Sequence, residues 1–481
     1  MIYQVPRHIS KDKIFIVNKS EIEGRLEPDF YKPSIASLEK QIRSLSTKRL
    51  RSYAQSFAGG ATPSKRNSEK YYSDSDIGIP FLRVQNLQTT GELLLDGCIY
   101  INEDTHNGLL KRSQVSEGDL LVKITGVGRM AIASVAPKDF VGNTNQHMVV
   151  IKTGNPSVSK YLAHYLNLDI IEQIASRYST GGTRPALDYP SLKNIPIIEG
   201  LDFSIIDNAI KDKKAKETEA QQLLDSIDDY LLKELGIIVP TKYTSSIKNR
   251  IFVINLSTIE RDRLDGNYFA KKYRILLDSI EEGAYPLHSL GDNNVTSFIS
   301  TGQTPKSDCY TEEDTDFPII KAGSYNGYEI DLGKISYTTK KQSYSVQKGD
   351  IFILSAAHQS EYIAKQICYL NEVPRPNTSF VGELLCIRAS ALVNSMYLYS
   401  LLSTEVYKTL LNREKRGQTS HLYANDVSRV LIPLPPIEKQ NEIAKHIGEI
   451  RLRAKALQEE GKNILENAKR EVERMIIGNG K

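Results

Sequence analysis

Short glycine-bearing segments are the places where this sequence comes nearest to cofactor chemistry. GGATPSK (residues 59–65) carries a lysine, but it lacks the GxxxxGK[ST] spacing that wraps backbone amides around the phosphates of a nucleotide. ITGVGRM (residues 124–130) contains Gly126 and Gly128, which do not complete the GxGxxG pattern of dinucleotide sites. We interpret the second segment as a turn between strands. Neither segment predicts a bound nucleotide.

Other signatures of catalysis are also incomplete. The aminomethyltransferase pattern, in which Asp, Asn or Ser precedes Pro-Pro-aromatic, is missing, since Pro435 and Pro436 lie between Leu434 and Ile437. A helix that begins near these prolines is the better interpretation. The 8 histidines have no HExxH-like spacing, and the 4 cysteines form no CxxC pair. We therefore expect no catalysis by this chain alone, no metal site and no bound cofactor.

Composition is that of an ordinary globular protein. A chain of 481 residues is too long for one core and predicts two or three domains. The N-terminus lacks the apolar segment of a signal peptide, and no apolar run reaches membrane-spanning length, so we expect a cytoplasmic protein without a membrane partner. A net charge of +4 is small, so a nucleic-acid partner would need a local basic surface or one supplied partly by another subunit.

Two long stretches have the apolar periodicity of paired helices. Their apolar residues recur at alternating steps of about four and three, as in a coiled-coil seam. The expected seam and partner-binding residues are Ile206, Ile210, Leu224, Ile227 and Leu231 in the first stretch, and Ile443, Ile447, Ile450, Leu457 and Ile464 in the second. The first stretch is polar near Lys213 and Glu217, where we expect an inserted turn to disturb packing least. A helix that merely covers a globular domain would show similar periodicity.

The chain repeats itself at about half its length, and this repeat predicts the architecture. Seven segments recur in the same order. Among them, GGATPSK matches TGQTPKS (residues 301–307), VSEGDLLVKI (115–124) matches VQKGDIFIL (346–354), NTNQHMVVIK (143–152) matches NTSFVGELLCIR (377–388), and STGGTRPAL (179–187) matches KRGQTSHL (415–422). Runs such as LLVKITG and IFILSAA predict strands, while residues 161–176 and 395–412 each predict an amphipathic helix.

We predict an α+β fold with two similar α/β domains, separated by two long antiparallel coiled-coil helices and related by a pseudo-twofold repeat. The domains are expected at residues 1–200 and 241–430, and the helices at residues 201–240 and 431–481. Two similar heads at a fixed separation suit a target with two sites at a fixed separation. Duplex DNA is the commonest such target, since half-sites on one face recur every ~34–36 Å. Because the halves differ, we expect an asymmetric, two-part recognition sequence.

The duplicated halves, the GxTP loops, IPLPPIEKQNEIA (residues 432–444) and LLDSIDDYLLKELGI (residues 223–237) together resemble the specificity subunit of type I restriction-modification systems. The resemblance covers nearly the whole chain. It implies two target-recognition domains that each read one half of a bipartite double-stranded DNA sequence, with helices that act as a spacer and bind two methyltransferase subunits. It also implies that S-adenosylmethionine, ATP and Mg²⁺ are bound by the methyltransferase and motor-nuclease subunits, and that this chain is not itself an enzyme.

Polar and basic loop residues are the candidates for contact with DNA. Arg, Asn and Gln have paired donors and acceptors that fit guanine and adenine in the major groove. In the first domain the candidates are Thr62, Ser64, Lys65 and Arg66 for phosphates, Arg83, Gln85, Asn86, Asn145, Gln146 and His147 for base edges, and Arg184. In the second they are Thr304, Lys306, Lys321, Tyr325, His358, Gln359, Asn377, Arg416, Gln418 and His421. Arg184 and Arg416 are favoured because each lies in a glycine-bearing loop, where backbone can approach phosphate closely.

Three alternatives stay open at this point. Each candidate side chain could be an ordinary solvated loop residue. The chain could be a fused restriction-modification enzyme, although it lacks nucleotide, methyl-donor and nuclease motifs. It could also be a coiled-coil scaffold with paired heads that does not bind DNA. Methyl transfer by the lone chain would favour the fused enzyme, and failure to bind duplex DNA even with partners would favour the scaffold.

Overall fold

The computed structural model describes residues 10–46, 48–240, 251–255, 259, 263, 265–357, 359–417 and 420–478. Its contacts divide the chain into a first unit, residues 1–217 with 458–481, and a second unit, residues 218–457. The division falls inside two long helices, α7 (Ser204–Glu234) and α13 (Ile437–Gly478). Each unit therefore contains one part of both helices.

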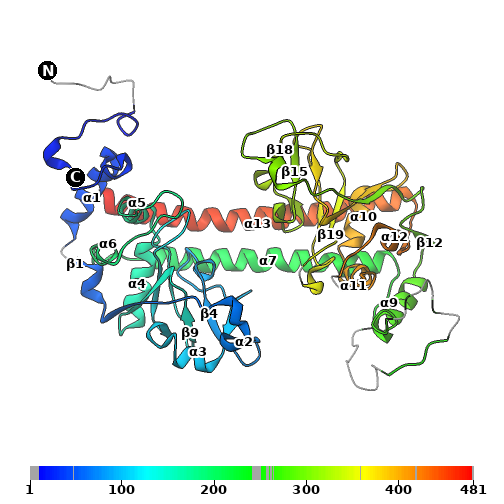
Figure 1. Ribbon diagram of the computed structural model, residues 1–481, viewed down its shortest axis with the longest axis horizontal. Helices are drawn as coiled ribbons and strands as arrows, with labels where there is room; N and C mark the ends of the chain where they lie inside the picture. Colours follow the sequence, from blue (N-terminus) through cyan, green and yellow to red (C-terminus); the bar gives the residue numbers. More distant parts are fainter. Residues whose placement is uncertain are drawn as a thin grey trace. The chain divides into compact units, whose positions relative to one another are not determined.

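The first unit is built on two main sheets (Figure 1). One has the strand order β2-β10-β7-β8, the other β3-β5-β4-β9-β6, and β1 pairs with β11. The strands are β1 (Lys48–Arg49), β2 (Ser56–Gly59), β3 (Tyr72–Ser73), β4 (Ile79–Leu82), β5 (Ile99–Ile101), β6 (Gln114–Ser116), β7 (Leu120–Lys123), β8 (Ala133–Val135), β9 (Val141–Thr144), β10 (Met148–Lys152) and β11 (Pro196–Ile197). The helices are α1 (Pro33–Leu45), α2 (Ser68–Tyr71), α3 (Glu103–Asn107), α4 (Pro156–Leu166), α5 (Asp169–Arg177) and α6 (Tyr189–Lys193).

The second unit repeats this plan. Its sheets have the orders β13-β22-β19-β20-β17-β16 and β14-β18-β15-β21, and β12 pairs with β23. The strands are β12 (Leu287–Ser289), β13 (Thr296–Thr301), β14 (Tyr310–Thr311), β15 (Pro318–Ile320), β16 (Tyr325–Asn326), β17 (Glu329–Ile330), β18 (Ser336–Thr338), β19 (Ile351–Leu354), β20 (Ile367–Tyr369), β21 (Ser379–Phe380), β22 (Leu384–Ala389) and β23 (Leu431–Pro433). The helices are α9 (Lys271–Glu281), α10 (Ser395–Leu402), α11 (Glu405–Arg413) and α12 (Ala424–Val427).

Strand order and side-chain contacts both confirm the predicted repeat. The order β2-β10-β7-β8 matches β13-β22-β19-β20, and β3-β5-β4-β9 matches β14-β18-β15-β21. One equivalent pair is parallel in both copies, β4 with β9 and β15 with β21, and the second unit has a further parallel pair, β17 with β20. The Tyr165 hydroxyl donates to the Pro196 carbonyl at 2.9 Å, as the Tyr397 hydroxyl does to the Pro433 carbonyl at 2.7 Å. The predicted mixed fold of two similar domains is therefore confirmed.

Each predicted amphipathic helix in the heads is in fact two helices. Residues 156–177 form α4 and α5, with a break at Asn167 and Leu168, and residues 395–413 form α10 and α11, with a break at Ser403 and Thr404. The Asn167 amide bonds to the backbone of Ala133, so it is drawn towards β8. The Thr404 hydroxyl accepts from the Tyr407 amide and caps α11. Continuous apolar periodicity across these breaks concealed them in the sequence.

The predicted antiparallel pairing of the long helices is found within each unit. In the first unit, a β-carbon on Gly461 would lie 3.3 Å from the Lys213 α-carbon, and Lys216 pairs with Glu460 at 2.8 Å. In the second unit, Arg453 pairs with Glu219 at 3.2 Å and Lys439 pairs with Glu234 at 2.6 Å. In both units, residue numbers rise along α7 as they fall along α13, which defines an antiparallel pair.

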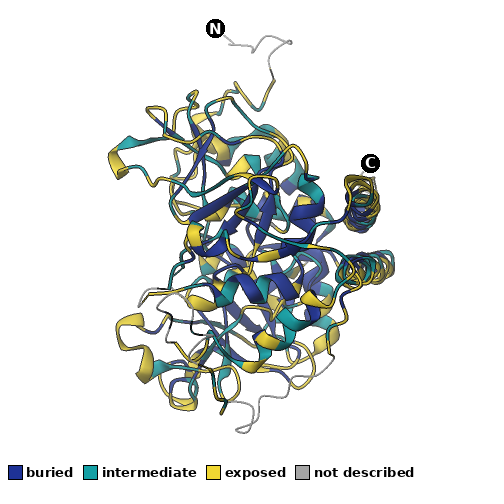
Figure 2. Ribbon diagram, turned by 90° about the vertical axis from the view of Figure 1, so that its right-hand side faces the viewer, coloured by how far each residue is buried: buried dark blue, intermediate teal, exposed yellow. Residues whose placement is uncertain are grey.

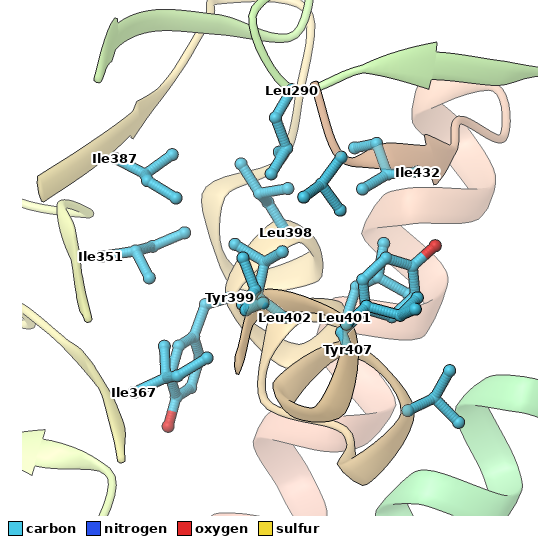
Figure 3. Packing of buried hydrophobic residues seen from close by; sticks show 14 of the residues in the cluster. Leu290, Ile351, Ile367, Ile387, Leu398, Tyr399, Leu401, Leu402, Tyr407 and Ile432 are labelled. Carbon is cyan, nitrogen blue, oxygen red and sulfur yellow. The ribbon is translucent and has the colours of Figure 1, made fainter. Parts of the chain in front are cut away.

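The long helices α7 and α13 contribute residues to the cores of the two units. In the second unit, Ile443 and Ile447 are fully buried in one cluster with Leu398 and Tyr407, which belong to the head. Figure 3 shows Leu398 and Tyr407 among other residues of this cluster. In the first unit, Ile206 and Ile210 lie in one cluster with head residues of α4 and α5. In Figure 2 the strands of the sheets are largely buried and the loops around them are largely exposed. Several residues of the predicted seam between the two helices are thus covered by head residues of the same chain.

Candidate nucleic-acid interface

Four loops of the first unit meet at one edge of its sheets: residues 59–66, 124–131, 144–147 and 180–187. The Thr62 hydroxyl donates to the Gln146 side-chain oxygen, and the Gln146 amide nitrogen lies 3.4 Å from the His147 Nε2. The backbone links the other loops, since the Ile124 amide donates to the His147 carbonyl at 2.9 Å and the Gly126 amide donates to the Pro185 carbonyl at 3.0 Å. These four loops, called here the first recognition edge, bring together Thr62, Gln146, His147 and Arg184.

The surroundings of His147 at this edge favour the neutral form of its imidazole. Burial lowers the pKa of His147, and the positive charge of Arg184 lowers it further. The imidazole is therefore neutral at pH 7 and presents one donor and one acceptor. Arg184, Thr62 and Gln146 are exposed. Such a set can bind both a phosphate and the edge of a base.

Gly60 permits the close approach that forms this edge. A β-carbon on Gly60 would lie 1.8 Å from the Thr144 carbonyl oxygen, and one on its equivalent Gly302 would lie 2.2 Å from the Phe380 carbonyl oxygen. Both values are far below van der Waals contact. The glycines of the two GxTP loops are therefore explained by packing against the neighbouring strand end, without any contact to a ligand.

Substitution of Gly60 or Gly302 by alanine is expected to destabilise its own unit by about 1–3 kcal/mol, because the loop and the strand must separate. Gly182→Ala and Gly323→Ala are matched controls, since a β-carbon at either position meets no atom within 4 Å. Thermal unfolding of the four variants measures the difference. Equal stability of Gly60→Ala and Gly182→Ala would contradict the packing role.

The second unit has an equivalent edge with different side chains. The Thr304 hydroxyl donates to the Glu383 carboxylate at 2.9 Å and accepts from the Gly382 amide at 2.9 Å. The Ser355 amide donates to the Glu383 carbonyl at 2.9 Å, as the Ile124 amide does to the His147 carbonyl. Glu383 thus occupies the position of His147. A carboxylate can accept a hydrogen bond from the N4 amino group of cytosine. A neutral imidazole has one donor and one acceptor, so it suits a different set of base edges.

Glu383 is a candidate that the sequence comparison missed. Matching NTNQ to NTSF placed Asn377 opposite Asn143. The strand registers instead place Ser379 there, because Phe81 pairs with Asn143 and Ile319 pairs with Ser379. Asn377 therefore lies two residues before β21 and not at the recognition edge position. The apolar runs of β10 (MVVIK) and β22 (LLCIRA), aligned with each other, were the signal that could have corrected the shift.

Three predicted contact residues are used inside the fold. Asn86 is 1% exposed, and its amide accepts from the Arg83 amide nitrogen and donates to the Leu94 carbonyl, both at 2.7 Å. Asn145 is 6% exposed and accepts from the His147 amide nitrogen at 3.1 Å. The Tyr325 hydroxyl is buried, and its burial raises its pKa. In the structure these side chains shape loops or pack inside the fold, and their contact with DNA stays a prediction.

The two favoured arginines have different surroundings. The Arg416 guanidinium donates through Nε and Nη2 to the carboxylate of Asp426, whose side chain is 1% exposed. Arg416 and His421 pair through their backbones as Thr180 and Ala186 do, so Arg416 is the equivalent of Thr180 and not of Arg184. Arg416 thus has a structural ion pair, whereas Arg184 lies exposed at the first recognition edge.

We expect Arg416→Ala to lower the stability of the second unit by about 2–3 kcal/mol, because among the described residues the buried Asp426 carboxylate would keep the weaker contact with Arg429 at 3.4 Å. Arg184→Ala should leave stability unchanged and weaken DNA binding. Unfolding and binding measured on the same two variants separate these roles. Weakened DNA binding by Arg416→Ala without loss of stability would contradict the assignment.

The remaining predicted residues stay candidates. Those that are exposed in the structure are Ser64, Lys65, Arg66, Gln85, Thr304, Lys306 and Gln359, and those that are partly exposed are Arg83, Lys321, Asn377 and His421. Lys321 lies over the ring of Tyr310 at 4.0 Å. His358 and Gln418 lie outside the described residues. Within the described ranges, no group of three or more His, Cys, Asp or Glu residues is placed to hold a metal ion. Within those ranges no helix is long and apolar enough to cross a membrane.

Comparison with known proteins identifies part of the chain. Residues 294–467 match the family model of the type I restriction modification DNA specificity domain. This match confirms, for that part of the chain, the resemblance inferred from the repeated motifs. A search of curated proteins finds no match.

Solved structures include similar chains at low sequence identity. A chain from a study of complex assembly and conformational transition of the type I R-M system has 15% identity and a TM-score of 0.43, with 90% of this chain and 96% of that chain covered. The type I restriction-modification S subunit from M. genitalium has 14% identity and a TM-score of 0.38, with 89% and 95% covered. The HsdS subunit from Thermoanaerobacter tengcongensis has 15% identity and a TM-score of 0.33, with 90% and 95% covered.

Proposed function

We propose that the whole chain is the DNA sequence-specificity subunit of a type I restriction-modification system. Residues 294–467, which match the model of the DNA specificity domain family, are the basis of this proposal. One structural observation carries the extension to the first half of the chain. The first unit repeats the strand order and the recognition edge of the second unit. Two such edges in one chain support recognition of two DNA half-sites.

The two half-sites should differ in sequence, because the edges present different side chains at equivalent positions. His147 and Gln146 in the first unit correspond to Glu383 and Gly382 in the second. A neutral imidazole and an amide read donors and acceptors on a base pair, whereas a carboxylate only accepts. An asymmetric bipartite target follows from this difference.

We further propose that the chain is not catalytic and acts in the cytoplasm with two methyltransferase subunits and with motor-nuclease subunits. S-adenosylmethionine, ATP and Mg²⁺ would then be bound by those partners. The incomplete nucleotide and methyltransferase motifs of the sequence support this division of roles.

The proposal is tested by reconstituting the chain with its methyltransferase subunits and mapping methylation on a library of DNA sequences. His147→Glu should change the preferred bases in one half-site and leave the other half-site as it was. Glu383→Gln should change only the other half-site. Methylation by the chain alone, a motif without two parts, or changes by one variant in both half-sites would contradict the proposal.

A further inference from the structure

Val127 occupies the tip of the loop between β7 and β8, at the first recognition edge. Its side chain is 78% exposed, although the residue is apolar. Gly126 and Gly128 flank it, and both have positive φ angles, of 123° and 80°. These conformations suit glycine, and they turn the chain sharply on each side of the valine. The loop is thus shaped to present one apolar side chain.

The loop is anchored on both sides of Val127. The Lys123 ammonium donates to the Val127 carbonyl at 2.8 Å, and the Gly126 amide donates to the Pro185 carbonyl at 3.0 Å. On the other side, the Arg129 guanidinium bonds to Asp169 and to the Asn167 carbonyl. The Val127 side chain therefore projects from a fixed backbone, next to the loop that carries Arg184.

The anchoring of this loop requires Lys123 to be buried, which is unfavourable for a charged side chain. The lysine is 3% exposed, and its burial lowers its pKa. A buried ammonium is unfavourable unless it is bound, and the Val127 carbonyl is its hydrogen-bond acceptor here. The equivalent position in the second unit, at the end of β19, is the apolar Leu354, so the fold itself does not require a lysine. The lysine serves the loop of the first unit.

Exposure alone would not assign a role, because single apolar residues are common on protein surfaces. Val141, for example, is 53% exposed at the opposite end of β9 from Thr144. Val127 differs in that its loop is fixed by a buried charge and lies at the edge formed by Thr62, His147 and Arg184. In the major groove, apolar groups of side chains recognise the 5-methyl group of thymine.

We propose that Val127 is a specificity-determining residue that packs against the 5-methyl group of a pyrimidine in the half-site read by the first unit, and that Lys123 is the residue that positions it. This inference rests on the proposed function. It assigns one base of that half-site as thymine or 5-methylcytosine. It also predicts that the second half-site is read without this contact.

The test uses the full chain with its methyltransferase subunits and DNA that carries the mapped motif. Each thymine of the half-site is replaced in turn by deoxyuridine, which removes only the methyl group, and each 5-methylcytosine is replaced by cytosine. With the unchanged chain, one replacement should weaken binding about threefold to fivefold, the value expected for one buried methyl group. Val127→Ala should weaken binding to methylated DNA by a similar factor and abolish the difference between the two DNAs. Which of the two bases responds identifies the source of the methyl group.

Two variants serve as controls. Val141→Ala should keep the full difference between thymine and deoxyuridine. Lys123→Met should keep the fold but lose much of the difference, since Val127 is present and no longer held. Loss of binding to both DNAs by the same factor would mean that Lys123 is only structural and would contradict its assigned role.

Failure of this inference can be told apart from failure of the proposed function. If the reconstituted complex has a two-part motif but no pyrimidine methyl group contributes, or if Val127→Ala keeps the full difference, the role of Val127 is wrong and the proposed function stands. If the complex shows no sequence-specific binding, both are wrong.

Discussion

Replacement of Ile447 by aspartate is expected to unfold the second unit. Ile447 is fully buried in the cluster that also contains Tyr397, Leu398 and Tyr407 of the head. The substitution removes most of a buried aliphatic side chain and places an unpaired carboxylate among apolar groups. It should lower the free energy of unfolding by about 3–5 kcal/mol or more. That cost is comparable to the whole stability of many domains. Thermal unfolding and limited proteolysis of the full chain measure it.

Leu452→Asp is the matched control for Ile447→Asp. Leu452 lies on the same helix, α13, and is 73% exposed, so the same charge there meets water. Its stability should stay within about 0.5 kcal/mol of the unchanged chain. As one of the seam and partner-binding residues expected from the sequence, Ile447 would instead be expected to affect assembly with partners before the head when it is replaced by a charged residue. Proteolytic protection of the second unit in Ile447→Asp equal to that in Leu452→Asp would contradict the shared core.

A paired insertion in the long helices is expected to change the gap between the two half-sites. Four residues added after Glu217 in α7 and four after Leu457 in α13 lengthen each helix by roughly 6 Å. Duplex DNA rises about 3.4 Å per base pair, so the gap should grow by one or two base pairs. The half-sites should stay the same, because the recognition edges are untouched. Methylation mapping of the variant measures both.

The insertion must be made in both helices. The sequence predicted that α7 alone tolerates it near Lys213 and Glu217, because that segment is polar. In the structure, however, Gly461 packs against the backbone of Lys213, and Lys216 pairs with Glu460. An insertion in α7 alone shifts one helix past the other and should lower the stability of the complex. An active complex with the paired insertion and an unchanged gap would show that these helices do not set the spacing.

The repeat and the fold class were predictable because they depend on features that a sequence displays directly. Gly-Asp turns before apolar runs predicted β7 and β19, and the structure has strands at both places. The same turns recur with equivalent ion pairs, Asp119 with Lys152 and Asp350 with Arg388. Residue type and spacing were sufficient there, since each copy supports the assignment of the other.

The candidate site was predictable only in part, because residue type does not give the direction of a side chain. Asn86 and Asn145 have the amides that suit base edges, yet both amides bond to the nearby backbone. Arg416 lies in a glycine-bearing loop, as predicted, but its guanidinium forms an ion pair with the carboxylate of Asp426, ten residues later in the sequence. Glu383 escaped notice because the match of NTNQ to NTSF shifted the two copies by two residues, which the strand pairing corrects.

The central claim is that one chain reads two different DNA half-sites with two equivalent edges. It is tested most directly by sequencing the methylated bases of the host genome with this chain present, deleted, and replaced by the His147→Glu variant. We predict one asymmetric bipartite motif that disappears on deletion and changes in a single half-site in the variant. A methylation pattern that is the same in all three strains would contradict the claim.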